Sequence, residues 1–138
     1  METNFWKVIL MPDQTYLGYC VVSLLRRDCG DLADLNSEEI ADFFKLAKKL
    51  EDAFRQAFNA TMFNWACLMN FAYQNNPPDP HVHWHFRPRY NHVVKFAGLE
   101  FVDPNFGHHY QPSTMREVDL GVREKIVEEI LKFVGSSF

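Results

Sequence analysis

The chain has 138 residues, 47% of them apolar and 15% aromatic, a composition typical of a folded globular protein and not of a disordered one. A formal net charge of −4 gives no broad electrostatic attraction to nucleic acid or to an anionic membrane surface. We therefore expect a single domain over residues 1–138. Any phosphate that it binds must be held by local contacts and not by the overall charge of the protein.

The cysteines and the N-terminus indicate the compartment. Cys20, Cys29 and Cys67 are odd in number, widely spaced and free of any C-x-x-C pair, so neither a disulfide framework nor a thiolate zinc site is indicated. Residues 1–14 lack the basic start and long apolar run of a secretory signal, and no stretch approaches the roughly 18 apolar residues of a membrane span. We expect a cytoplasmic protein with no membrane or nucleic acid partner.

The first half of the chain predicts paired strands and then a helix. Residues 5–11 and 17–25 are β-branched and aromatic runs, and the turn residues between them favour a hairpin or strand pair. A helix is predicted from Asn36, because Asn36 and Glu39 can form a capping box and apolar residues then recur at helical spacing. Its apolar face is expected to pack on the sheet.

Two further segments alternate strictly between apolar and polar residues. In residues 62–71 the odd positions are apolar, and Asn64 and Asn70 lie on the other face. Residues 81–86 alternate in the same way, with histidine at every odd position. Both segments are predicted to be strands.

The rest of the chain completes the predicted layout. A strand or hairpin is expected within residues 93–102, and a last helix over about 120–134 that ends at Gly135. Strands with two separate helices predict an α+β fold with an antiparallel sheet.

The three histidines carry the chemical information. A strand places His81, His83 and His85 on one side, about 6.5 to 7 Å from one to the next, with apolar residues on the other side. Neutral imidazoles are nucleophiles, proton carriers and hydrogen-bond donors, which suits binding and transfer of a phosphorus centre. Two alternatives stay open: polar residues on a solvated face, and a site for zinc or another divalent metal, although no obvious carboxylate or thiolate completes the ligands.

The run HVHWHFR resembles the H-φ-H-φ-H-φ-φ signature of the histidine triad family, in which φ is apolar. The following Pro88-Arg89, the earlier Gly18 to Val22 and the segment Leu32 to Glu39 resemble further family segments in the family's order. The resemblance covers about residues 5–90. It implies a histidine triad fold with an antiparallel sheet of about five strands, a central helix and a C-terminal helix.

The resemblance also implies a mechanism. His83, the middle histidine, would attack the α-phosphate to give a nucleotidyl-histidine that water resolves, while His81 and His85 serve the phosphate oxygens and proton transfer. Related transferases have glutamine at the third position, so His85 favours hydrolysis.

Three further residues are predicted to contact the nucleotide. The family's amide on the neighbouring strand corresponds to Asn70 by counting back from His81, although counting forward from Phe63-Asn64 gives Leu68. Arg87 replaces a usually aliphatic residue and could pair with a β- or γ-phosphate. Asp13 could contact ribose hydroxyls. The competing interpretations are turn chemistry for Asn70 and Asp13 and a plain surface position for Arg87.

The sequence differs from the family pattern at two places, so it does not identify the leaving group. Pro77-Pro78-Asp79-Pro80 stands where the family often has G-Q-(S/T)-V, so the hydroxyl on the leaving-group side is missing. Asp28 stands where the phosphoramidase branch has a histidine. Residues 91–112 match no family segment, and they either shape the leaving-group pocket or form a surface hairpin and loop.

The sequence therefore predicts a homodimeric nucleotide hydrolase that acts on a dinucleoside polyphosphate or a related conjugate and releases a nucleoside monophosphate. We expect that the protein requires no cofactor and binds no metal of its own. Mg²⁺ can enter the site bound to the phosphates of a polyphosphate substrate. The alternatives are a nucleotide-binding regulatory protein with little turnover and a histidine-based metal protein.

Overall fold

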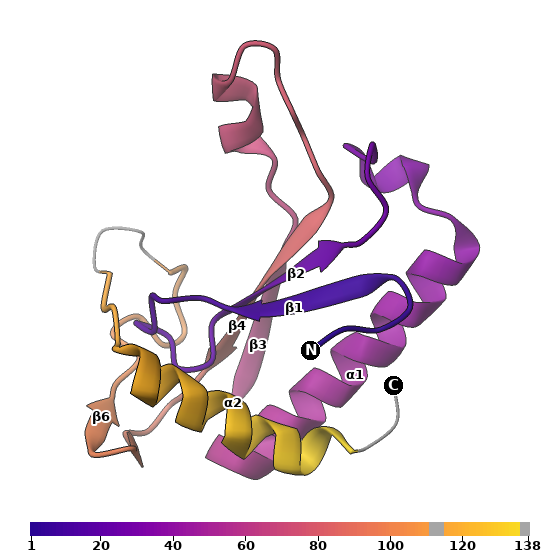
Figure 1. Ribbon diagram of the computed structural model, residues 1–138. Helices are drawn as coiled ribbons and strands as arrows, with labels where there is room; N and C mark the ends of the chain where they lie inside the picture. The colour runs from indigo at the N-terminus through magenta and orange to yellow at the C-terminus, as the bar shows by residue number, and fades with distance from the viewer. Residues whose placement is uncertain (111–114, 136–138) are drawn as a thin grey trace.

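The computed structural model describes residues 1–110 and 115–135 (Figure 1). Its strands are β1 (Trp6–Leu10), β2 (Cys20–Leu24), β3 (Met62–Ala66), β4 (His83–Arg89), β5 (Val94–Phe96) and β6 (Leu99–Phe101). Its helices are α1 (Ser37–Phe58) and α2 (Leu120–Val134), with short 3-10 helices η1 (Leu32–Asp34) and η2 (Asn70–Gln74). The fold is α+β with an antiparallel sheet, as predicted.

The main sheet has the strand order β1-β2-β4-β3, so β4 is paired along both of its edges. The hairpin expected within residues 93–102 forms as β5 and β6, which pair with each other in a separate two-stranded sheet. Because β4 has no free edge, the strands that follow it cannot pair beside it. In the described part of the chain the main sheet thus has four strands, where about five were expected.

The start of α1 and the end of α2 are capped as the sequence predicts, and the start of α2 has a further cap. The Asn36 side chain accepts from the backbone N–H of Glu39, and the Glu39 carboxylate accepts from the backbone N–H of Asn36. At the start of α2, Asp119 accepts from the N–H of Val122, and the helix ends at Gly135, whose φ is 79°. Local hydrogen bonding therefore fixes where α1 and α2 start.

A single apolar layer lies between the sheet and the two long helices. Figure 1 shows α2 crossing α1 near its C-terminal end, and the two helices contact each other. The buried residues of this layer include Trp6, Val22, Leu24 and Phe86 from the sheet, Leu46, Leu50 and Phe54 from α1, and Ile126 from α2. Since both long helices pack on one face of the sheet, neither of them covers the histidine face. Among the described residues, no helix is both long and apolar enough to cross a membrane.

The third strand is shorter than predicted. Alternation predicts a strand over residues 62–71, but β3 ends at Ala66 and the chain enters η2. Figure 1 shows η2 in an excursion that projects from the sheet before the chain returns into β4. Continued beyond Ala66↔His85, the register would set residues 67–70 opposite residues 84–81, but the pairing stops there and the chain turns away into η2. The second half of the predicted strand therefore leaves the sheet.

A buried ion pair fixes the far end of β4. The side chains of Arg89 and Asp103 are 1% and 0% exposed, and Arg89 Nη2 lies 3.0 Å from Asp103 Oδ1. Arg89 also donates to Asn64 Oδ1 and to the carbonyl oxygens of Asn105 and His108. One side chain of β4 therefore holds the segment after β6 against the end of the sheet.

Asp103→Asn should lower the free energy of unfolding by about 3 to 5 kcal/mol, because it leaves the Arg89 guanidinium buried without a counter-charge. Urea denaturation measures this. As a control, Glu100→Gln breaks the exposed Lys95–Glu100 pair and should cost less than about 1 kcal/mol. Equal losses in the two variants would contradict the importance assigned to the buried pair.

Candidate active site

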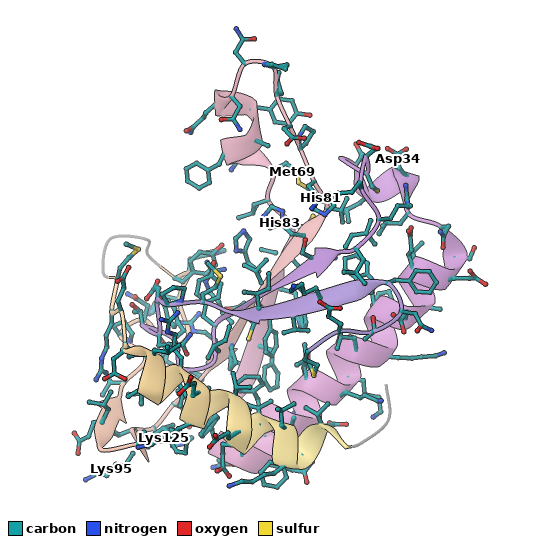
Figure 2. All side chains as sticks on the ribbon, in the orientation of Figure 1. Asp34, Met69, His81, His83, Lys95 and Lys125 are labelled. Atoms are coloured by element: carbon teal, nitrogen blue, oxygen red, sulfur yellow. The ribbon has the colours of Figure 1, made fainter. Side chains whose placement is uncertain are left out.

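The histidine row lies on the open face of the sheet. Val82 and Phe86 are fully buried on the core side, whereas His81, His83 and His85 are half-buried. Figure 2 shows His81 and His83 at the end of β4 where the η2 excursion joins the sheet. His83 and His85 thus lie on one face of β4, opposite the apolar layer, as predicted, while His81 lies just before the strand, which begins two residues later than expected.

One backbone carbonyl determines the tautomer of His83. Its Nδ1 lies 2.8 Å from the carbonyl oxygen of His81. A carbonyl oxygen can only accept, so Nδ1 must carry the proton. In the neutral ring the lone pair is then on Nε2, which is the form that a nucleophile or a hydrogen-bond acceptor requires.

His81 is anchored in a different way. Its Nε2 lies 2.8 Å from the carbonyl oxygen of Leu24, at the end of β2, and must therefore donate. The backbone on either side is tied as well, since the N–H of Leu24 donates to the carbonyl of Val82. His81 thus fastens the start of the histidine row to the neighbouring strand.

His85 is paired with a tyrosine. The Tyr19 hydroxyl lies 2.8 Å from His85 Nδ1. Burial, with smaller contributions from the charges of Arg87 and His83, lowers the pKa of His85 to about 4. Burial raises the pKa of Tyr19 above its ordinary value, so the phenol keeps its proton. The Tyr19 and His85 pair is therefore uncharged at neutral pH.

Arg87 continues the row on the same face of β4. Its guanidinium carbon lies 4.1 Å from the ring centre of Tyr19 and 4.0 Å from that of Tyr110. The guanidinium is thus held between two aromatic rings, one from the start of β2 and one from the segment after β6. Arg87 therefore packs against two tyrosines on the histidine face, and its contact with a phosphate stays a prediction.

The two other predicted contacts lie elsewhere. The Oδ1 of Asp13 accepts from the backbone N–H and hydroxyl of Thr15 and from the N–H of Arg116, so this oxygen is engaged in a turn. Asn70 is an exposed residue of η2 and not an amide on the neighbouring strand, because β3 ends before it. The expected strand position of Asn70 was wrong, and its contact with a nucleotide stays a prediction.

Sequence reasoning missed three residues beside the row. Register places Ser23 directly opposite His83 and Asn64 opposite Arg87, which puts both on the histidine face. Tyr19 was seen only as part of a strand motif. Period-two counting back along residues 17–25 would have placed Tyr19 and Ser23 on one face, but only the register shows which histidine each one meets.

Each histidine of the row has its own hydrogen-bond partner. Backbone carbonyls engage one nitrogen of His81 and one of His83, and a tyrosine engages one of His85. Within residues 1–110 and 115–135, no three His, Cys, Asp or Glu side chains are arranged to hold an ion. Metal-ligating histidines are oriented through their second nitrogen in the same way, so the histidine-based metal protein stays an alternative.

The lowered pKa of His85 should make stability depend on pH. Histidine in an unfolded chain has a pKa of about 6.5, so between roughly pH 6.5 and pH 4 the unfolded chain binds a proton at His85 that the folded chain does not. The free energy of unfolding should therefore fall as the pH is lowered through this range. His85→Gln should lose this part of the dependence in urea denaturation.

The control is His109→Gln, which changes an exposed histidine and should keep the pH dependence of the parent protein. NMR titration gives a direct measurement, in which the His85 ring stays neutral until the pH approaches 4. A His85 signal that titrates near its ordinary value would show that burial does not govern this ring.

The chain matches one domain family and resembles several solved structures. The model of the HIT domain matches residues 6–92, more than half of the chain. Among curated proteins no match is found. Three solved structures of similar fold are histidine triad proteins from Bradyrhizobium japonicum, Sinorhizobium meliloti 1021 and Marinobacter aquaeolei VT8.

Their likeness to this chain is extensive in structure and low in sequence. The first has a TM-score of 0.70 at 16% identity and covers 97% of this chain and 87% of its own. The second has a TM-score of 0.75 at 14% identity and covers 95% of this chain and 84% of its own. The third has a TM-score of 0.75 at 16% identity and covers 96% of this chain and 85% of its own. These similarities establish the shared fold, and together with the domain match over the triad they show that the chain belongs to the histidine triad (HIT) family.

Proposed function

We propose that the protein is a nucleotide hydrolase that cleaves a phosphoanhydride or phosphoramidate bond at the α-phosphate of a dinucleoside polyphosphate or a related nucleotide conjugate. The observation that carries the proposal is the hydrogen bond from His83 Nδ1 to the His81 carbonyl, which leaves the Nε2 lone pair available on the open face. Membership of the HIT family, which covers nucleotide-binding hydrolases and related proteins, supports it.

The proposed reaction has two displacements at phosphorus. First, His83 Nε2 forms a bond to the α-phosphorus while the bond to the leaving group breaks in line, and its electron pair departs with that group. Water then attacks the same phosphorus and loses a proton to the bulk solvent, and the phosphorus-nitrogen bond breaks with its electrons returning to His83 Nε2. The products are a nucleoside monophosphate and the leaving group.

His85 supports this reaction as a neutral hydrogen-bond donor. In the tautomer that accepts from the Tyr19 hydroxyl at Nδ1, the proton of His85 is on Nε2, where it can bond a non-bridging phosphate oxygen. A pKa of about 4 makes the imidazolium scarce at pH 7, so in the proposed proton transfer a neutral His85 can accept a proton more readily than it can donate one. His81 orients His83 through its carbonyl.

Other parts of the proposal rest on the sequence. Asn70 and Asp13 stay predicted nucleotide contacts, and Mg²⁺ would travel with the substrate's phosphates. A homodimer stays an expectation from the family resemblance. A cytoplasmic location, expected from the cysteine pattern, is compatible with the three cysteines being free.

One alternative is favoured by a specific feature of the chain. The prolines at residues 77–80 replace the hydroxyl that many family members place on the leaving-group side. A protein without that hydroxyl could bind nucleotides with little turnover. Assays against a panel of adenylylated compounds separate this binding protein from the hydrolase.

His83→Ala should separate the two functions at one side chain. Removing the nucleophile should lower turnover on the order of 10⁴-fold or more, while nucleotide binding survives because the other contacts remain. Steady-state kinetics and calorimetry measure the two effects. His109→Ala, at an exposed position after β6, is the matched control and should turn over like the parent. Undiminished turnover by His83→Ala would refute the mechanism.

The covalent intermediate should be detectable directly. A phosphorus-nitrogen bond to imidazole is labile in acid and comparatively stable in base, so turnover should be quenched with alkali. Peptide mass analysis is then expected to find a nucleotidyl group on the peptide that contains His83 and none in the His83→Ala sample. An adduct on another residue would reassign the nucleophile.

Purified active protein should be poor in metal, because the proposed nucleophile is an imidazole and not a metal-bound water. Elemental analysis measures this, with chelator treatment of the same sample as the activity check. Stoichiometric zinc, together with activity abolished by chelation and restored by zinc, would favour a metallohydrolase instead.

A further inference from the structure

Arg87 is a cation with no anionic partner in the described chain. Its guanidinium contacts the rings of Tyr19 and Tyr110. Within residues 1–110 and 115–135, no carboxylate or carbonyl oxygen is hydrogen-bonded to this guanidinium. Arg89, two residues further along β4, is by contrast fully satisfied by Asp103 and backbone carbonyls. The chain therefore neutralises one arginine of β4 and leaves the other available.

The aromatic contacts restrict how Arg87 can bind. Rings against the guanidinium occupy its faces, while its N–H groups radiate in the plane between them. A planar fork of donors matches the oxygens of a phosphate, and an already ordered side chain loses little rotamer freedom on binding. Arg87 therefore has the geometry of a preorganised anion-binding group.

The position of Arg87 relates this group to the nucleophile. Arg87 follows His83 by four residues on the same face of β4, about 13 Å along the strand. Tyr19 lies between these two positions, because its hydroxyl is hydrogen-bonded to His85 and its ring contacts Arg87. A phosphate chain that starts at His83 and passes His85 would bring its further phosphates toward Arg87.

We propose that Arg87, held between Tyr19 and Tyr110, is an anion subsite for the leaving group and selects substrates whose leaving group carries further phosphates over those with an uncharged one. This inference rests on the proposed hydrolase function and narrows its substrate class. Tyr110 is a positioning residue supplied from beyond residues 6–92, the part matched by the HIT model. Arg89 anchors its segment through the His108 carbonyl.

Two substrates with the same adenylyl group and different leaving groups test the subsite. For diadenosine triphosphate, Arg87→Gln should lower kcat/KM by roughly 10- to 100-fold, whereas for adenosine 5′-phosphoramidate the change should stay within about 3-fold. The exposed Lys125 on α2 supplies the control, Lys125→Gln, which also removes one positive charge and should alter neither substrate (Figure 2). Equal losses on both substrates would overturn the selectivity.

Tyr110 is tested by a pair of substitutions. Tyr110→Leu removes the ring and should raise KM for diadenosine triphosphate while kcat changes little, because the lost interaction is with a remote phosphate. Tyr110→Phe keeps the ring against Arg87 and should restore the parent KM. If Phe and Leu behave alike, the ring does not position Arg87.

Binding of inorganic pyrophosphate provides a readout that does not depend on turnover. Calorimetry should show at least about 10-fold weaker binding to Arg87→Gln than to the parent or to Lys125→Gln. If this difference is found but neither substrate is turned over by the parent, the subsite stands and the hydrolase proposal fails. If the parent turns over substrate but pyrophosphate binds equally to all three proteins, the subsite is refuted and the hydrolase proposal survives.

Discussion

Strand β4 is the constraint on which the rest of the site depends, because it is hydrogen-bonded on both edges and has a different chemistry on each face. A slip of one residue would expose Val82 and Phe86, now fully buried, and bury the histidines. Each fully buried apolar side chain is worth about 1.5 to 3 kcal/mol, against a total stability of about 5 to 15 kcal/mol for a typical protein. The hydrophobic layer therefore fixes the register, and the register places His83 opposite Ser23.

The same strand scaffold determines protonation through uncharged groups. Carbonyl oxygens of His81 and Leu24 fix the proton positions on His83 and His81. A carboxylate in either place would orient a ring equally well, but it would favour the imidazolium and repel an anionic substrate. Backbone dipoles therefore suit a row of neutral imidazoles that meets a phosphate.

Local patterns could be predicted from the sequence, and contacts between distant segments could not. The capping box of Asn36 and Glu39 and the alternation through the histidines involve neighbours a few residues apart, and the structure confirms both. The position of Asn70 depends on where β3 stops, and counting residues fails because the pairing ends at Ala66↔His85, before Asn70 is reached. The contact of Tyr110 with Arg87 joins segments that only the folded chain brings together.

The electrostatics of His85 and the anion subsite bear on the same choice of leaving group. Burial is the larger cause of its lowered pKa, and the charge of Arg87 is second. An anion bound at Arg87 would offset the second cause and leave the first, so His85 stays neutral at pH 7 whether or not the subsite is filled. A neutral His85 is only a weak acid toward an amine that must leave protonated. A phosphate needs no proton to leave, because it departs as a stable anion. The neutral histidine and the unpaired arginine therefore both favour a leaving group that carries its own negative charge.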